Sequence, residues 1–304
     1  MWLEWLAGHR RDVSVMADDG RGRRLSHNAD VPRVLASTVK VVHLLAYTTA
    51  VAQGQLDPDE PVPVRDWDAW HPFDGDGPLG DGAHYQALTA LGIPCDEYGV
   101  ARNPERHVPL GEIAKAMIRF SDNAAPDYLR TRLGDDSLRD AAAGAGWPDP
   151  DIRWFCGETL RSLFPGDRDA LAERFTQDPA FRRQVLERVQ GEPISPDDEW
   201  EWTRRTAHGT AAELFALHRT VATASTRPAE LARRMLRGPA GVLFKGGSLP
   251  RTSGFGLSTP DGGTVTMLLT GTDFPDPQLP ALGLDLLADL PAFTGALGVR
   301  AVPG

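Results

Sequence analysis

The sequence predicts an α+β fold, with an antiparallel sheet built from both chain ends, flanked by helices and joined to an all-helical subdomain. Three observations predict it: a strand hairpin opens the chain, three strand-like segments lie near its end, and the middle is mostly helical. The 304 residues, 41% of them hydrophobic, suffice for one large domain. We expect a single domain over 1–304, with an α/β part at about 1–36 and 238–304 and a helical part at about 37–237.

The strands are predicted from alternation and turn signals. Residues 12–17 alternate as a strand does, and the turn DDGRG separates them from a second strand at RRLSHN. Near the C-terminus, GVLFKGGSL, SGFGLSTP and TVTMLLTGTD indicate three successive strands, with a turn at PDGG. The segment 61–108 is rich in Pro, Gly, Asp and Trp, so we expect it to be mostly irregular.

Helices are predicted from periodicity, caps and apolar runs. The stretch that follows Ser37 is apolar nearly all round and is stopped by Gly54, which is typical of a buried helix. Two helices within 109–133 meet at Ser121-Asp122-Asn123, where Asp122 or Ser121 can cap the second one. The other expected helices span 2–8, 84–91, 135–146, 168–175, 180–190, 210–224, 228–237 and 278–296.

Composition limits the partners and cofactors. The net charge of −10 provides no basic face for phosphates, so we expect no nucleic acid partner. The first residues lack the features of a signal peptide, and no stretch approaches the ~20 apolar residues of a membrane span, so we expect a cytoplasmic protein.

Asp74, Asp76 and Asp81 lack the spacing of a calcium loop, and Cys95 and Cys156 are expected to be separate thiols. No metal or organic cofactor is implied.

Lysine is rare in this chain. Only Lys40, Lys115 and Lys245 occur among 32 basic residues. Lysine differs from arginine because it can lose its proton when buried. Lys40 follows Ser37 by three positions, so both side chains share one helix face. A buried lysine there can accept a proton from the serine hydroxyl, whereas the alternative is a capping serine beside a surface lysine.

Two further segments can carry chemistry. In Ser121-Asp122-Asn123 a serine can relay protons and an asparagine amide can hold a substrate carbonyl, although a helix cap alone would also explain this segment. Lys245, on a predicted strand, precedes Gly246, Gly247 and Ser248, and the two glycines allow a substrate backbone to approach closely. The alternative is a strand that simply leads into a turn.

Taken in order, the motifs S-x-x-K, SDN and K-x-G resemble those of the serine β-lactamase and D,D-peptidase superfamily, the penicillin-recognising serine hydrolases, and especially its class A-like branch. The resemblance covers most of the chain and implies a β-lactamase/transpeptidase-like fold. It implies that Ser37 is the acylated nucleophile and Lys40 its general base. It also implies that Ser121 shuttles a proton to the leaving group.

The remaining site residues also follow from this resemblance. Asn123 would bind the substrate amide, and Lys245 would attract a substrate carboxylate. The backbone N–H groups of Ser37 and Ser248 would form the oxyanion hole. Gly246 replaces the hydroxyl-bearing residue or histidine usual in the family, which removes a hydrogen bond that reads the carboxylate.

Glu158 is the candidate for the deacylating acid. It lies at about the expected distance after SDN, but TLRS follows it where the family has x-x-L-N. It is therefore either the equivalent glutamate or a nearby acid.

The sequence thus predicts a serine hydrolase or acyltransferase that cleaves a small-molecule amide, lactam or ester through an acyl-Ser37 intermediate. One alternative is a class A-type β-lactamase that hydrolyses penicillins. The other is a non-catalytic ligand-binding domain on the same fold, against which the intact set Ser37, Lys40, Ser121, Asn123 and Lys245 argues.

Overall fold

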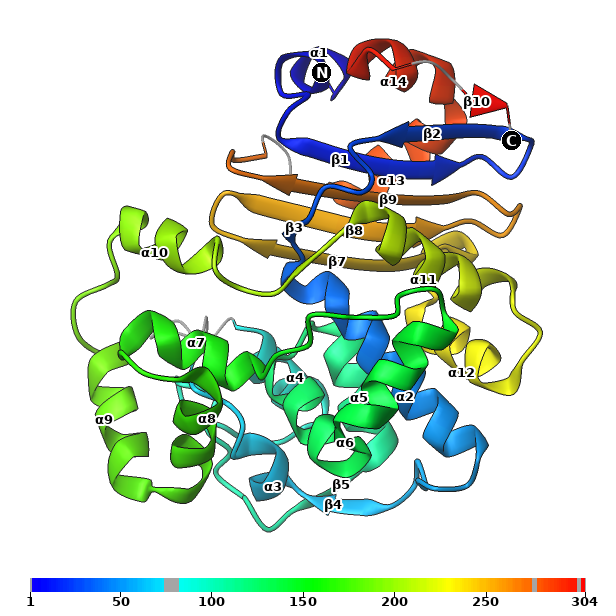
Figure 1. The fold of residues 1–304 in the computed structure, drawn as a ribbon. Helices are drawn as coiled ribbons and strands as arrows, with labels where there is room; N and C mark the ends of the chain where they lie inside the picture. Colours follow the sequence, from blue (N-terminus) through cyan, green and yellow to red (C-terminus); the bar gives the residue numbers. More distant parts are fainter. Residues whose placement is uncertain (1, 74–81, 275–277, 300–301, 304) are drawn as a thin grey trace. The chain divides into compact units, whose positions relative to one another are not determined.

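A computed structural model describes residues 2–73, 82–274, 278–299 and 302–303 of the chain. It contains two compact units, each formed from separate parts of the sequence. The sheet unit comprises Met1–Thr48, Arg139–Asp151 and Thr203–Gly304, and the helical unit comprises Thr49–Leu138 and Ile152–Trp202. The α+β fold class predicted from the sequence is confirmed, with an antiparallel sheet that both chain ends build (Figure 1).

The main sheet has the strand order β10-β2-β1-β9-β8-β7, and neighbouring strands are antiparallel. Its strands are β1 (Val13–Asp18), β2 (Arg23–His27), β7 (Leu243–Leu249), β8 (Thr252–Ser258), β9 (Thr264–Thr270) and β10 (Val302–Pro303). The N-terminal hairpin and the three C-terminal strands therefore lie where the alternating pattern predicted them. Strand β1 pairs with β9, so the hairpin adds directly to the C-terminal strands.

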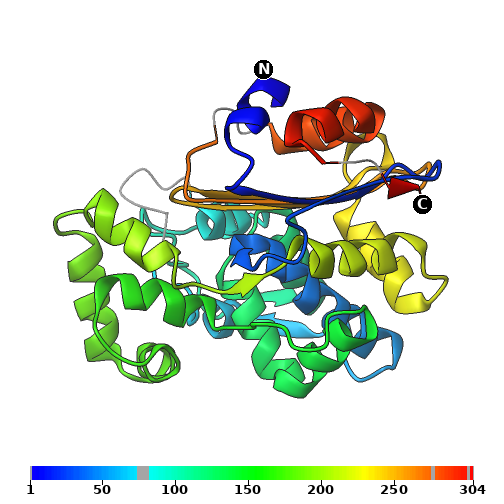
Figure 2. The same cartoon turned by 45° about the horizontal axis from the view of Figure 1, so that its top comes forward.

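Helices cover both faces of this sheet (Figure 2). On one face lie α1 (Trp2–Gly8), α13 (Leu279–Ala288) and α14 (Leu290–Leu297), and on the other lie α11 (Ala211–Thr223) and α12 (Arg227–Leu236). Because both faces are covered, β9 is buried along almost its whole length and carries the apolar run TVTMLL. The core under α13 and α14 includes Phe255, Met267 and Phe293.

The predicted helix over 278–296 is wrong in one respect, because two helices occupy it. Helix α13 ends at Ala288, and α14 begins at Leu290 with Pro291 in its first turn. Asp289 lies between them and accepts a hydrogen bond from the Ala292 N–H at 3.1 Å. Proline cannot continue a helix but fits a first turn, and aspartate caps that turn, so the chain turns here.

Two short elements lead to the first motif. Strand β3 (Arg33–Val34) pairs with β6 (His208–Gly209), and the 3₁₀-helix η1 (Ala36–Val39) follows and runs into α2 (Lys40–Ala52). Gly209 is needed in this ladder, since a Cβ there would lie 2.8 Å from the Trp147 ring and 3.1 Å from Leu35. The apolar helix predicted after Ser37 is confirmed, with a 3₁₀ turn at its start.

In the helical unit, β4 (Pro61–Pro63) pairs with β5 (His107–Pro109). Helices α3 (Val64–Asp68), α4 (Ala83–Ala90), α5 (Leu110–Arg119) and α6 (Ala124–Gly144) follow along the chain, and α6 continues into the sheet unit. Gly134 interrupts α6 with φ 76° and ψ 160°, so the two helices predicted around this point share one element with a kink. Among the described residues, no helix is long and apolar enough to cross a membrane.

The charged segment 166–205 forms helices α8 (Arg168–Gln177), α9 (Pro179–Val189) and α10 (Pro196–Thr203). Together with α7 (Phe155–Leu163), which the sequence pattern did not predict, α8 and α9 enclose a second apolar core of the helical unit. Phe175, Phe181 and Val185 supply its buried side chains from one side, and Cys156 and Leu160 supply them from the other. The high charge of this segment therefore belongs to the outer faces of helices that are apolar inside.

Candidate active site

The S-x-x-K motif lies at the junction of η1 and α2 in the sheet unit. Ser37 is half-buried, and Lys40 is completely buried. The Lys40 Nζ donates a hydrogen bond to the Ser37 Oγ at 3.0 Å. Thr38 stabilises the turn, since its Oγ1 donates to the Leu35 carbonyl at 2.6 Å. At this distance a neutral lysine can take the serine proton directly, which excludes the alternative of a surface lysine.

Strand β7 lies directly beside this turn because Gly247 has no side chain. A Cβ at Gly247 would lie 2.4 Å from the Ser37 backbone nitrogen and 2.9 Å from that of Thr38. Only glycine therefore lets β7 approach the start of η1 so closely. Ser248 follows it and is exposed. Gly246 has a different neighbour, because a Cβ there would meet the Phe244 ring at 3.0 Å.

Lys245 lies on β7 opposite Gly256 of β8. Its side chain is almost completely buried, and its Nζ donates to the Gly246 carbonyl at 2.6 Å. Burial, together with the positive charge of Lys40, holds the pKa of Lys245 well below its usual range. The two lysines of the predicted motifs therefore act on each other electrostatically within the sheet unit.

A third basic side chain, His218 of α11, completes this buried group. It packs on the backbone of β8, since a Cβ at Gly256 would lie 2.0 Å from the His218 Nε2. Burial and the nearby Lys245 lower the pKa of His218 to about 4, so the imidazole is neutral at physiological pH. Sequence reasoning missed His218, because a lone histidine on an apolar helix face carries no signal for its neighbours.

The SDN segment joins α5 to α6 in the helical unit. Asp122 is completely buried, and its Oδ1 accepts hydrogen bonds from the Ala124 N–H at 2.7 Å and the Ala125 N–H at 3.1 Å. The prediction that this segment caps the second helix is confirmed, with Asp122 as the cap. Ser121 has a left-handed backbone, with φ 64°, and like Asn123 it is half-buried.

A buried group of charged side chains that the sequence did not indicate lies behind Asp122. The His84 Nδ1 is 3.0 Å from the Asp122 Oδ2, and the His84 Nε2 is 3.1 Å from the Asp68 Oδ1. His71 stacks on His84 with ring centroids 4.3 Å apart. These residues come from segments up to 54 positions apart, so only the fold shows that they meet.

Glu158 lies in the first turn of α7, also in the helical unit. Its Oε1 is 3.4 Å from Arg153 and 3.2 Å from Arg168, and its side chain is only 11% exposed. Asp127 holds the start of the helix, because its carboxylate accepts hydrogen bonds from the backbone N–H groups of Phe155 and Cys156. Two arginines therefore compete with any water for the Glu158 carboxylate.

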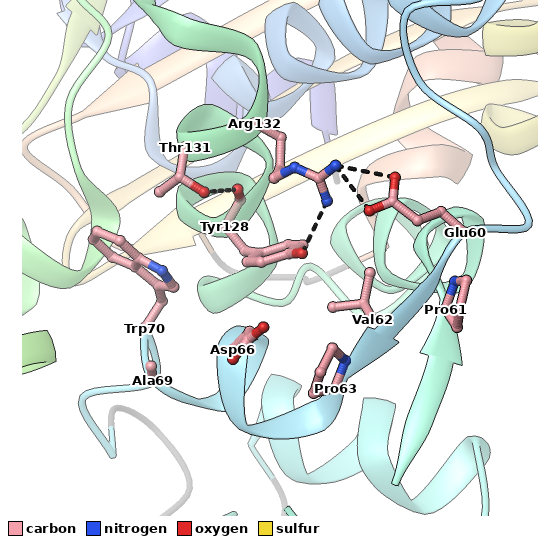
Figure 3. A pocket seen from close by; sticks show the side chains of 10 residues that line it. All are labelled: Glu60, Pro61, Val62, Pro63, Asp66, Ala69, Trp70, Tyr128, Thr131 and Arg132. Atoms are coloured by element: carbon pink, nitrogen blue, oxygen red, sulfur yellow. Dashed lines mark hydrogen bonds and ion pairs between the residues drawn. The ribbon is translucent and has the colours of Figure 1, made fainter. Parts of the chain in front are cut away.

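The aromatic residues of 61–108 pack within the helical unit. Trp67 is completely buried, and Trp70 stacks on Trp154 with centroids 4.7 Å apart. Trp70 also borders a cavity of about 480 Å³, shown in Figure 3, where Arg132 donates to Glu60 at 3.0 Å and to the Tyr128 hydroxyl at 3.2 Å. The Arg132 side chain thus connects two residues that line the cavity, Glu60 and Tyr128.

Acidic, histidine and cysteine side chains can also form metal sites. Asp74, Asp76 and Asp81 lie outside the described residues. Within the described ranges, no group of three or more His, Cys, Asp or Glu side chains has the arrangement of a metal site.

Several solved structures share the fold of this chain. They include a β-lactamase from Sphaerobacter thermophilus DSM 20745, at 18% identity and TM-score 0.56, with 94% of this chain and 91% of that chain covered. A class A β-lactamase from Mycobacterium abscessus matches at 18% identity and TM-score 0.54, with 98% and 100% covered. A PBP-A mutant in acyl-enzyme complex with penicillin G matches at 15% identity and TM-score 0.54, with 95% and 93% covered. The fold is therefore that of the β-lactamases and PBP-A.

The sequence itself places the chain in a family. The model of the β-lactamase enzyme family matches residues 3–237, which is most of the chain. The chain belongs to this family and is a serine hydrolase of the β-lactamase type, which acts through an acyl-enzyme. No match was found among curated proteins.

The low pKa of Lys245 predicts a pH-dependent cost in stability. In the unfolded chain this lysine has a pKa of about 10.4, and in the folded protein its pKa is well below that value. Between these two pKa values the unfolded chain binds more protons than the folded protein. Stability therefore rises with pH across this window. We expect Lys245→Met to be more stable than the wild type at pH 7, with a difference that shrinks toward pH 10. Urea unfolding of both proteins between pH 6 and pH 10 measures the difference in the free energy of unfolding and its dependence on pH.

Lys115→Met is the matched control, since Lys115 is exposed and pairs with Glu112. It should change stability little and without this pH trend. Equal or lower stability of Lys245→Met at pH 7 would contradict the electrostatic account.

Proposed function

We propose that Ser37 is the acylated nucleophile of this hydrolase and that Lys40 is its general base. The observation that supports this most strongly is the 3.0 Å hydrogen bond between the Lys40 Nζ and the Ser37 Oγ, with Lys40 fully buried. Burial next to a second buried lysine disfavours two ammonium charges, and one neutral lysine is what proton abstraction needs. The substrate class is a small-molecule amide, lactam or ester.

Each step then has a residue assigned to it. Lys40 takes the Ser37 proton while the Oγ attacks the carbonyl carbon of the substrate. The backbone N–H groups of Ser37 and Ser248 stabilise the oxyanion, and Gly247 lets β7 lie close to the Ser37 backbone because it carries no side chain. The bond to the leaving nitrogen or oxygen breaks as Ser121 delivers a proton to it and takes from Lys40 the proton that came from Ser37. Lys40 is then neutral again, and the acyl group remains on Ser37.

Substrate binding uses the other motif residues. Asn123 binds the amide of the substrate, and Lys245 attracts an anionic group such as a carboxylate. With glycine at position 246, no side-chain hydroxyl reads that carboxylate. This favours an amidase or esterase over an enzyme tuned to penicillins, and penicillins then act as slow substrates.

Deacylation is the slow step in this proposal. Glu158 is the candidate base, but Arg153 and Arg168 lie 3.4 and 3.2 Å from its Oε1, so a water must compete with two arginines for this oxygen. The acyl-enzyme therefore either hydrolyses slowly or passes its acyl group to another nucleophile. PBP-A, which shares the fold, has been trapped in mutant form as an acyl-enzyme with penicillin G, which supports penicillin as a probe. A cytoplasmic location remains a prediction.

Intact-mass spectrometry after incubation with a fluorescent penicillin and, separately, an activated ester tests this function. We expect an adduct on the wild type that persists for the penicillin, and none on Ser37→Ala, because the alanine has no nucleophilic oxygen. An adduct of equal yield on Ser37→Ala would contradict the assignment of Ser37. No adduct and no turnover with either probe would contradict the proposed substrate class.

The glycine pair on β7 gives a second prediction. Gly247→Ala places a methyl group 2.4 Å from the Ser37 nitrogen and must displace the nucleophile or the strand, so we expect acylation to slow by about 100-fold or more. Gly246→Ala is the matched control, because its methyl group meets the Phe244 side chain at 3.0 Å and a backbone atom, the Gly254 carbonyl oxygen, only at 3.6 Å. Stopped-flow acylation rates compare them, and equal losses in both variants would contradict the role of Gly247.

A further inference from the structure

His84 occupies an unusual position, between two buried carboxylates. Its side chain is 2% exposed, that of Asp122 is completely buried and that of Asp68 is 9% exposed. The Nδ1 faces Asp122 at 3.0 Å and the Nε2 faces Asp68 at 3.1 Å. The imidazole therefore links the end of α3 to the SDN segment inside the helical unit.

The hydrogen-bond partners of the two ring nitrogens determine the charge of the His84 side chain. A carboxylate accepts hydrogen bonds, so both nitrogens can donate only if the ring is a cation. Burial opposes that charge, but the Asp122 and Asp68 carboxylates outweigh it and raise the pKa of His84 above its ordinary value. The pKa values of Asp68 and Asp122 are lowered in turn, chiefly because His84 offsets their burial. The position between two carboxylates and the raised pKa both favour an imidazolium at His84.

Asp68, one of the two carboxylate partners of His84, is also held in place. Arg182 of α9 donates to the backbone carbonyls of Asp68 at 2.9 Å and Ala69 at 3.0 Å, and it lies 3.8 Å from the Asp68 Oδ2. Its guanidinium lies over the ring of Phe175 at 4.7 Å. A continuous path of polar contacts therefore runs from α9 through Asp68 and His84 to Asp122.

Asp122, the other carboxylate partner of His84, belongs to the SDN segment. The Asp122 Oδ1 is occupied by the first N–H groups of α6, so the Oδ2 is the oxygen that His84 binds. Ser121, the residue before it, has a positive φ of 64°, a conformation that costs a non-glycine residue free energy and persists only if its neighbours hold it. Asn123 follows directly. A shift of Asp122 would move both neighbours.

We propose that His84 is a positioning residue for the reaction, which holds Ser121 and Asn123 in place by binding the Asp122 carboxylate from behind. This inference rests on the proposed function, which assigns Ser121 and Asn123 to the active site. It also gives the segments 61–108 and 166–205 a role. They supply Asp68, His84 and Arg182, which support the motif from the side of α3 and α9.

Two substitutions of His84 separate its two bonds. The amide nitrogen of asparagine can take the place of the Nδ1, so His84→Asn keeps a donor for Asp122 and loses the one for Asp68. The amide nitrogen of glutamine can take the place of the Nε2, so His84→Gln keeps the donor for Asp68 and loses the one for Asp122. Both variants remove the same positive charge. His107→Asn and His107→Gln are the matched controls, since His107 is exposed on β5 in the same unit.

Two readouts are needed, and the first does not involve activity. Hydrogen exchange of the Ala124 and Ala125 amides reports whether Asp122 still caps α6. The acylation rate of the folded protein with the probes above reports whether Ser121 and Asn123 are still placed for reaction. We expect His84→Gln to lose about 10-fold or more in amide protection and in acylation rate, as for loss of a hydrogen bond between charged groups. His84→Asn should retain most of both, and the His107 variants should change neither.

Equal effects of His84→Asn and His84→Gln on exchange and acylation would overturn the proposal, because a merely structural role depends on the charge and not on which bond survives. Unchanged exchange in a folded His84→Gln would overturn it as well. If either His84 variant fails to fold, Asp122→Asn, which keeps an acceptor for α6 and weakens the bond to His84, takes its place with the same expected losses. A wild type that no probe acylates refutes the proposed function, and the exchange data then decide the positioning role alone.

Discussion

The rest of the proposed catalytic arrangement depends on the contact between the Lys40 Nζ and the Ser37 Oγ. It requires a lysine with no exposed surface at the start of an apolar helix, which follows from the run VVHLLAY that continues α2. It also requires that β7 lie against the turn, and Gly247 alone allows that approach. The apolar helix and the glycine strand are therefore two halves of one constraint, since each places the same serine.

Burying basic groups together is unfavourable, and the structure shows how the sheet unit limits this. Lys245 is buried beside Lys40, and burial together with that neighbouring charge lowers its pKa, so two ammonium charges side by side are disfavoured. His218, the next basic group, is neutral because its pKa is about 4. The single ammonium charge of the lysine pair, carried by Lys245 in the proposed mechanism, is then available to an anionic substrate or a developing oxyanion. The helical unit uses the opposite solution, in which an imidazolium is matched by two carboxylates.

Local patterns were enough to predict the α+β class, the hairpin, the C-terminal strands and the Asp122 cap, because alternation and capping act over a few residues. They also indicated Ser37, Lys40 and Gly247, since the motif spacing is itself local. The arginines around Glu158 were not predicted, because the spacing of Glu158 from SDN does not show what binds its side chain. His84 and Arg182 were missed for a similar reason, since they meet Asp68 only through packing of separate helices.

The central claim is that Lys40, and not only Ser37, is needed for acylation. The most direct measurement is a comparison of the wild type and Lys40→Met by peptide-mass mapping after timed exposure to the fluorescent penicillin and the activated ester. The account predicts that the wild type carries the acyl group on the peptide that contains Ser37. It predicts that folded Lys40→Met carries almost none, because no base removes the serine proton. Labelling of Ser37 in Lys40→Met at the wild-type rate would contradict it.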